Sequence, residues 1–178
     1  YYVYKNTQKS YRDLPYRMSE TSTLFRSEDS GEMHGLTRVR QFTITEAHNV
    51  IRPDQAEEEL KNCFDLAYYV LSTLGLQDDV TYRLSKWDPA NKKKYLGDED
   101  YWNRTQEALR EVLREKGVPF VEADGEAAFY GPKIDIQAKN VYGKEDTMIT
   151  IQLDCAIAEN FDLYYIDQNG DKVRPYII

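Results

Sequence analysis

Two candidate strands on either side of a polar loop set the strongest limit on how this chain of 178 residues folds. The segments 24–28 and 38–44 have the composition of strands, and the polar, glycine-containing segment 29–37 separates them. This pattern predicts two antiparallel strands joined by a long exposed turn. An antiparallel sheet is therefore expected near the start of the chain.

The rest of the chain adds more strands than helices. A proline at position 53 and three acidic residues at 57–59 begin a helix that is expected to end at Gly75. A second helix is expected over 99–116, with Asp98 as its cap and Gly117 as its stop. Further strands are predicted at 80–85, 134–139, 148–154 and 163–167, and Asn169-Gly170 predicts a tight hairpin to 172–173. The fold class is therefore α+β, an antiparallel sheet flanked by helices.

The charge distribution narrows the possible ligands. Lysine and arginine number 23 and aspartate and glutamate 31, a formal charge of −8, which argues against a surface that clings everywhere to nucleic acid or anionic membrane. Residues 1–42 hold seven basic and five acidic groups, so the first quarter carries +2 and the remainder −10. An anionic ligand is expected in that first quarter.

Cysteine use and hydropathy bear on the compartment. Cys63 and Cys155 lie 92 positions apart with no Cys-x-x-Cys spacing, so we expect neither a disulfide framework nor a thiolate zinc cluster. No apolar run approaches the length of a membrane span, and the first ten residues lack the apolar segment of a signal peptide. We expect a cytoplasmic protein, one domain without repeats, and no membrane partner.

Four side chains around the polar loop are expected to meet. Arg26 and Glu28 stand two apart on the first predicted strand, and Arg38 and Phe42 stand four apart on the second, so each pair shares a face. If the strands pair, two guanidinium groups, a carboxylate and an aromatic ring converge, a set that suits a nucleoside triphosphate. The alternative is a solvated strand face with exposed salt bridges.

These residues resemble a known sequence motif. Phe25-Arg26-Ser27-Glu28 and Arg38-Val39-Arg40-Gln41-Phe42 are similar to motif 2 of the class II aminoacyl-tRNA synthetases, at about 24–44 in this chain. Further blocks, in the same order, resemble the threonyl-tRNA synthetase family: residues 10–15 (SYRDLP), 35–40 (GLTRVR), 129–136 (FYGPKIDI) and 150–154 (TIQLD).

The resemblance implies an ATP site on the hairpin. Arg26 would contact the α-phosphate and the carboxylate of the amino acid, and Glu28 would accept from the adenine amine. Arg38 would contact the γ-phosphate, and Phe42 would stack on the base. Gln152 would also bind the nucleotide.

The resemblance implies an amino-acid site as well. Lys133 would lie near the reacting phosphate, which makes it catalytic together with Arg26. Tyr130 would lie near the amino group of the substrate, and Glu46 would receive the threonine hydroxyl. His48 matches the family's middle zinc ligand, with the other two ligands expected outside this chain. Zn²⁺ bound there would select a hydroxyl amino acid by coordination.

The function implied is ATP-dependent activation of threonine, with Mg²⁺, and its transfer to tRNA(Thr) by a homodimeric threonine-tRNA ligase. Residues 1–178 would be an incomplete class II catalytic core, with the editing and anticodon-binding domains outside the chain. Activation would rest on geometry and charge neutralisation, without a general acid or base.

Three positions depart from the family pattern near the substrates. Ile44 stands where glutamine is usual, Glu46 is one methylene longer than the usual aspartate, and Thr147 replaces a glutamine. The alternative interpretation is therefore a fragment or paralogue without catalytic activity that serves as a nucleotide- or tRNA-binding module.

Overall fold

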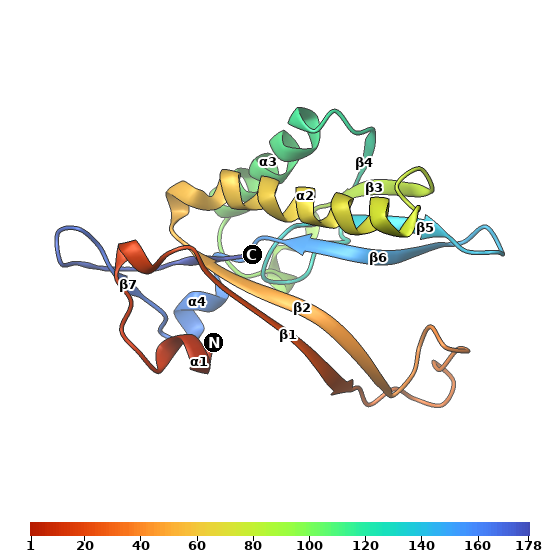
Figure 1. The fold of residues 1–178 in the computed structure, drawn as a ribbon, viewed down its shortest axis with the longest axis horizontal. Coiled ribbons are helices and arrows are strands. Elements are labelled where there is room, and N and C mark those ends of the chain that lie inside the picture. The colour runs from red at the N-terminus through yellow and green to blue at the C-terminus, as the bar shows by residue number, and fades with distance from the viewer.

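A long antiparallel hairpin dominates the first third of the chain. The computed structural model describes residues 1–178, and it pairs β1 (Tyr16–Phe25) with β2 (Gln41–Ile51) from Tyr16 opposite Val50 to Phe25 opposite Gln41. The hairpin projects from the rest of the molecule (Figure 1). The expected antiparallel pairing is confirmed, but both predicted strands were placed too close to the turn.

A four-stranded sheet forms the centre of the molecule. Its order is β4 (Phe120–Ala123), β3 (Val80–Ser85), β5 (Lys133–Lys139) and β6 (Glu145–Gln152). β5 pairs antiparallel with both β3 and β6, whereas β4 runs parallel to β3. A parallel pair needs a long crossover, and the segment that contains α3 (Glu99–Glu115) supplies it. The α+β class is confirmed, with one parallel pair and one strand, β4, that the sequence pattern did not predict.

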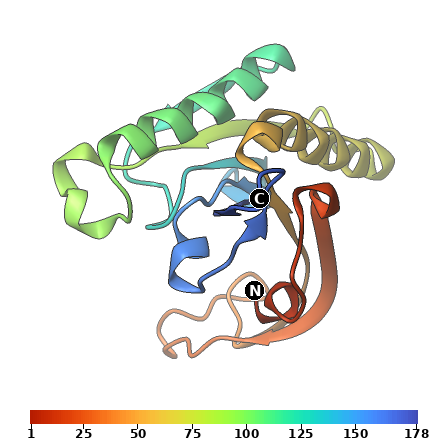
Figure 2. The ribbon, with the colours of Figure 1, turned by 90° about the vertical axis from the view of Figure 1, so that its left-hand side faces the viewer.

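Two helices cover one face of this sheet. α2 (Ala56–Leu74) ends at Gly75, whose φ of 72° is the left-handed conformation that glycine adopts without strain. α3 begins at Asp98, whose carboxylate accepts the Tyr101 amide at 2.7 Å. Figure 2 shows both helices on one side of the molecule and the β1–β2 hairpin on the other. The main core lies between helices and sheet, and it comprises Leu60, Phe64, Ala67, Leu71, Tyr82, Leu84, Leu109, Val112, Leu113, Ile134, Ile136, Ile151 and Leu153.

Short elements complete the chain. They are α1 (Tyr2–Lys5), the 3₁₀ turns η1 (Tyr11–Asp13), η2 (Pro53–Gln55) and η3 (Pro89–Lys94), α4 (Ile157–Asn160), β7 (Tyr165–Ile166), β8 (Lys172–Val173) and β9 (Tyr176–Ile177). β7 and β8 form the hairpin that Asn169-Gly170 predicts. No helix has the length and apolar character needed to cross a membrane. Both cysteines are free thiols.

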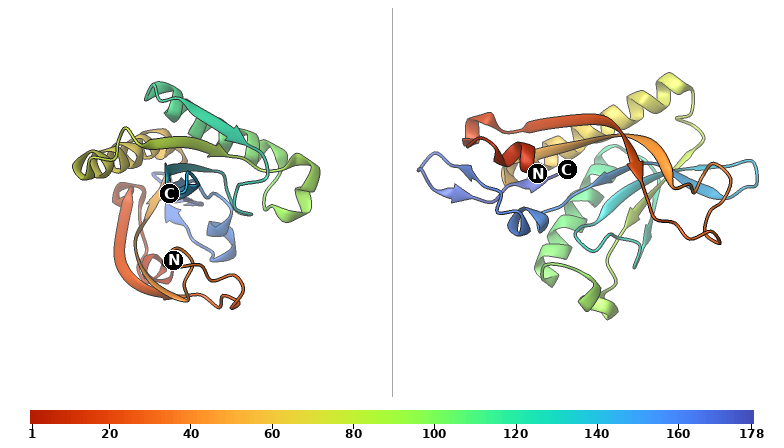
Figure 3. Two further views of the ribbon diagram at one scale, coloured as in Figure 1. Left: turned by 90° about the vertical axis from the view of Figure 1, so that its right-hand side faces the viewer. Right: turned by 90° about the horizontal axis from the view of Figure 1, so that it is seen from below.

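The end of the chain connects the two sheets. β9 pairs antiparallel with β2, and the Asn49 and Ile178 backbones exchange hydrogen bonds of 2.8 and 2.9 Å. On its other side, Ile177 exchanges two bonds of 2.8 Å with Asp154, just after β6. The two further views in Figure 3 show the C-terminus between the hairpin and the larger sheet.

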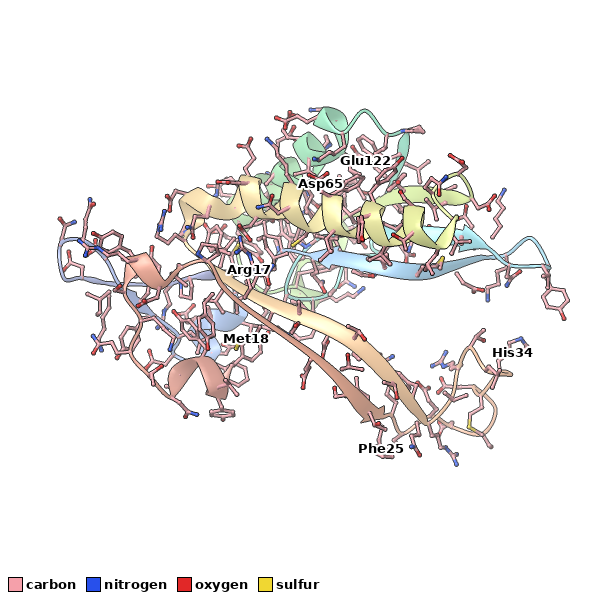
Figure 4. The ribbon with its side chains drawn as sticks, viewed as in Figure 1. Arg17, Met18, Phe25, His34, Asp65 and Glu122 are labelled. Atoms are coloured by element: carbon pink, nitrogen blue, oxygen red, sulfur yellow. The ribbon has the colours of Figure 1, made fainter.

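Ion pairs connect the hairpin to α2 and the two long helices to each other. Arg17, at the base of the hairpin, donates from Nε to the buried Glu59 of α2 at 2.9 Å. Asp65 of α2 accepts from Lys116, just after α3, at 2.6 Å. Figure 4 shows Arg17 at the hairpin base, with Asp65 of α2 and Glu122 of β4 above it.

A further group of ion pairs, between Glu122 of β4 and the side chains of Arg110 and Lys86, makes the stability of the fold depend on pH. Hydrogen bonds from Arg110, then from Lys86, lower the pKa of Glu122 to about 2. The stabilisation is fully present above the unfolded pKa of about 4.3 and is lost as the pH falls toward 2. Because the side chain is 31% exposed, we expect Glu122→Gln to cost about 1 kcal/mol at pH 7. Urea unfolding of both proteins should show this difference shrinking below about pH 4.3.

The matched control is Asp171→Asn, because Asp171 is exposed, lies outside the helices and forms no ion pair. An equal loss in the two variants at pH 7, or a difference for Glu122→Gln that does not change with pH, would contradict the assignment.

Candidate functional site

One face of β2 carries a row of half-buried side chains. Phe42, Ile44, Glu46 and His48 alternate with the exposed Gln41, Thr43, Thr45 and Ala47, as the period of two in a strand requires. At about 3.3 Å per residue, the row extends roughly 20 Å from Phe42 to His48. Three of the predicted site residues, Phe42, Glu46 and His48, therefore share one line along the hairpin.

The end of the hairpin holds the other predicted residues of the first quarter. Arg26, Glu28 and Arg38 lie beyond the ends of β1 and β2, so the prediction that strands carry them was wrong. The pairing continues for one residue, because the Arg26 amide donates to the Arg40 carbonyl at 2.9 Å. After that the chain turns, and the Glu28 amide donates back to the Arg26 carbonyl at 3.0 Å. The loop conformation, and not strand periodicity, places these side chains.

The four residues nevertheless come together as two pairs. The Arg26 guanidinium lies 5.0 Å from the centre of the Phe42 ring, in cation–π contact. Arg38 donates to Glu28 from Nε at 3.0 Å, and its terminal nitrogen lies 2.9 Å from the same carboxylate and 3.4 Å from Glu32. Figure 4 shows Phe25, at the end of β1, and His34, in the loop, at this far end of the hairpin. Arg38 is therefore paired with carboxylates, whereas Arg26 contacts an aromatic ring.

A second group of predicted residues lies at the end of β6 and the start of β5. The Tyr130 hydroxyl donates to Gln152 at 3.0 Å, and the Gln152 amide donates to the Gly131 carbonyl at 3.2 Å. Only glycine fits at 131, because a Cβ there would lie 2.0 Å from the Leu153 carbonyl oxygen. This close approach of two backbones sets where Tyr130 lies.

Lys133 belongs to a polar cluster that the sequence pattern did not reveal. Its ammonium lies 3.1 and 3.0 Å from the two oxygens of Asp135, a fully buried carboxylate. Ser85, Thr150 and Arg83 also donate to Asp135, at 2.7, 3.0 and 3.1 Å. Burial favours the neutral acid, but the hydrogen bonds from Ser85 and Lys133 outweigh it and hold the pKa of Asp135 below its usual range.

Strand register explains the cluster. Arg83, Asp135 and Thr150 are direct cross-strand partners on β3, β5 and β6. Leu84, Ile134 and Ile151 form the next row and point to the opposite face, into the main core. The alternation of polar and apolar residues in 133–136 signals this two-faced sheet, but only the register shows which polar residues meet.

His48 lies at the far end of the β2 row. Its ring packs edge-on against Tyr1, with the ring centres 5.6 Å apart.

The Tyr130 hydroxyl lies near two carboxylates. Burial raises the pKa of Tyr130, and the nearby carboxylates of Asp154 and Glu46 raise it further. Glu46 and Asp154 therefore lie within electrostatic range of Tyr130.

The predicted zinc ligand His48 has no complete set of other ligands around it in this chain. A zinc ion needs three or four protein ligands, and no group of three or more His, Cys, Asp or Glu side chains here is arranged to hold a metal. His48 alone does not fit the ion, so we derive no step that uses zinc.

Comparison with known proteins was made on sequence and on structure. The family described as tRNA synthetase class II core domain (G, H, P, S and T) matches residues 1–178, the whole chain. The chain belongs to this class II core family. Within it, the chain is 62% identical over its full length to a threonine-tRNA ligase of Clostridium perfringens and 57% identical to one of Clostridium botulinum. It spans 28% of the length of each of these relatives.

Solved structures agree with this assignment to the class II core family. A structure described as the RNA binding domain of threonyl-tRNA synthetase from Cryptosporidium parvum superposes with a TM-score of 0.87 at 34% identity, covering 99% of this chain and 43% of that one. A Giardia lamblia prolyl-tRNA synthetase, at 16% identity and a TM-score of 0.65, covers 98% of this chain and 28% of its own and shares the fold.

One candidate site residue of this class II core was missed from the sequence. Glu20 of β1 lies directly opposite Glu46 of β2, and directly opposed residues project from the same face of the sheet. Neither carboxylate has a salt-bridge partner, whereas Glu28, Glu32 and Glu59 each pair with an arginine of the hairpin. Two like charges therefore face each other along the β2 row.

This opposition predicts a gain in stability on substitution. Glu20→Gln should raise the free energy of unfolding by about 0.2–1 kcal/mol, because it removes a like-charge pair. Urea unfolding at low and high salt measures the gain, which should shrink as salt screens the charges. A loss of stability, or a gain that is unchanged at high salt, would contradict the opposition as its cause.

Proposed function

We propose that this chain forms the ATP- and threonine-binding core of a threonine-tRNA ligase. The observation that carries the proposal is the convergence of Arg26, Phe42, Glu28 and Arg38 at the end of the hairpin. Two guanidinium groups, a carboxylate and an aromatic ring suit the phosphates, the exocyclic amine and the base of ATP. The relatives are threonine-tRNA ligases, which makes threonine the proposed amino acid.

The nucleotide would lie along the hairpin. Adenine would stack on Phe42, on the ring face that Arg26 leaves open, since the guanidinium at 5.0 Å leaves no space for a base between them. Arg38 would exchange the Glu28 and Glu32 carboxylates for the γ-phosphate, and Glu28 would then accept from the adenine amine. The ion pair thus holds both groups in place until a nucleotide replaces it.

The amino acid would lie further along the same row. Tyr130 and Glu46 would contact its amino and hydroxyl groups, while Gln152, bonded to Tyr130, would border the nucleotide. A carboxylate oxygen of threonine would attack the α-phosphorus, the bond from that phosphorus to the bridging oxygen would break, and pyrophosphate would leave with Mg²⁺. Arg26 and Lys133 would neutralise the negative charge that develops at the α-phosphate.

The remaining steps belong to the intact protein. There the adenylate would pass its threonyl group to the 3′ end of tRNA(Thr), in a cytoplasmic homodimer whose editing and anticodon-binding domains lie outside this chain. A nucleotide- or tRNA-binding module without catalysis is the second candidate, favoured by Ile44 in place of a hydrogen-bonding glutamine.

Calorimetric titration of the chain with ATP and Mg²⁺ tests the proposed site. We expect saturable binding at one site, weakened at least about tenfold by Arg26→Ala, because a hydrogen bond to a charged group is worth about 1.5–3 kcal/mol. Arg12→Ala is the control, since the Arg12 guanidinium bonds only to the Tyr11 hydroxyl. The absence of ATP binding by the folded chain, or equal effects of the two variants, would contradict the proposal.

A phenylalanine pair tests the adenine contact separately. Phe42→Leu should weaken ATP binding by about tenfold, because a base stacked on an aromatic ring gains about 1–3 kcal/mol. Phe25 is its control: it lies at the same end of the hairpin, pairs with Gln41 and therefore points from the opposite face. Phe25→Leu should leave affinity unchanged, and a similar loss in both variants would show that hairpin packing, and not stacking, is being measured.

A further inference from the structure

The carboxylate of Asp135 has no part in the proposed contacts with substrate, yet it occupies the centre of the sheet's polar face. It is completely buried and accepts from four residues: Ser85, Thr150, Arg83 and Lys133. Three of these donors lie on neighbouring strands: Arg83 and Thr150 directly opposite Asp135, and Ser85 two residues beyond Arg83 on the same face, so they fix the carboxylate relative to the sheet. Lys133, the fourth, stands two residues away on the same strand and face.

We propose that Asp135 is a positioning residue, which holds the Lys133 ammonium in the place where the proposed function needs it, beside the α-phosphate of ATP. The inference rests on that proposed function. A lysine side chain has several freely rotating bonds, and ordering it costs up to about 2 kcal/mol. Its contact with a carboxylate that cannot itself move supplies this order before the nucleotide arrives.

The hydrogen-bond count leaves Lys133 able to bind a phosphate. An ammonium has three N–H donors, and its contact with Asp135, at 3.0 and 3.1 Å, leaves at least one of them free. The Lys133 side chain is 23% exposed, whereas that of Asp135 is 0% exposed. A ligand at this face therefore meets the ammonium and not the carboxylate.

The charge count points the same way. Arg83 and Lys133 contribute two positive charges and Asp135 one negative charge, so the three together carry +1. Glu126 also lies 4.0 Å from Arg83, but its side chain is 56% exposed, so water screens its charge. Because Arg83 shares the carboxylate, Asp135 orients Lys133 without cancelling the positive charge at the polar face.

A double-mutant cycle separates positioning from simple stabilisation. The four proteins are the unsubstituted chain, Asp135→Asn, Lys133→Ala and the double variant, each titrated with ATP and Mg²⁺ and each melted. We expect Asp135→Asn to weaken ATP binding about fivefold alone and to add nothing in the Lys133→Ala background. The melting temperature should fall with Asp135→Asn in both backgrounds, because asparagine has one acceptor oxygen in place of two and no charge for the buried donors.

A matched control and a milder variant complete the design. Asp65→Asn removes another carboxylate from a lysine, Lys116, on the helical layer, and should leave ATP affinity unchanged. Should Asp135→Asn fail to fold, Thr150→Val loosens the same carboxylate by removing one donor. It is expected to weaken ATP binding by about twofold, again only when Lys133 is present.

The outcomes distinguish this inference from the function on which it rests. No ATP binding by the unsubstituted chain contradicts the proposed function and this inference with it. The positioning role alone is overturned if Lys133→Ala weakens ATP binding but Asp135→Asn does not. It is also overturned if Asp135→Asn weakens ATP binding equally with and without Lys133.

Discussion

The relative placement of the two sheets depends on a few backbone hydrogen bonds made by the last three residues. β9 pairs with β2 on one side and with Asp154, just after β6, on the other, through four bonds of 2.8 to 2.9 Å. β2 carries Phe42, Glu46 and His48, while the segments around β5 and β6 carry Lys133 and Gln152. Besides this short strand, the Arg17–Glu59 pair, the hydrogen bond from Asn49 to Cys63 and side-chain packing help to set the distance between the two halves of the candidate site.

Local sequence patterns predicted the elements that bury a large apolar stripe. Both long helices and the strands β3, β5 and β6 fall close to their predicted positions, because each presents many residues to one core. β4 and β9 were missed because they have four and two residues, and their pairing partners lie far away in the sequence. A strand this short has too few residues to show an alternation, and its existence depends on a neighbour that local sequence does not reveal.

Some positions of the candidate-site residues could be predicted from the sequence, and others could not. Phe42, Glu46 and His48 share one face of β2, but the predicted strand ended at residue 44, so Glu46 and His48 were known only from the family resemblance. The period of two, applied to Arg26 and Glu28, failed, because the strand ends at Phe25 and a turn follows. Asp135 was missed for a different reason. A single aspartate in a strand gives no sign that three residues from two neighbouring strands will donate hydrogen bonds to it. Contacts across strands therefore contain the information that the sequence of one strand lacks.

The two parts of the site differ in how firmly they are held. Lys133 rests on a carboxylate fixed by three other donors inside a four-stranded sheet. The end of the hairpin, in contrast, exposes Phe25 and Leu36 at 74% and 95%, and its arginines contact only residues of the hairpin itself. In the proposed function, a ligand with phosphates would have to displace Arg38, whose side chain is 52% exposed, from Glu28, whereas moving Lys133 would disturb a network around the fully buried Asp135. Adjustment to a bound nucleotide would, in that proposed function, therefore fall to the hairpin, and the sheet would supply the fixed reference against which the reacting phosphate is aligned.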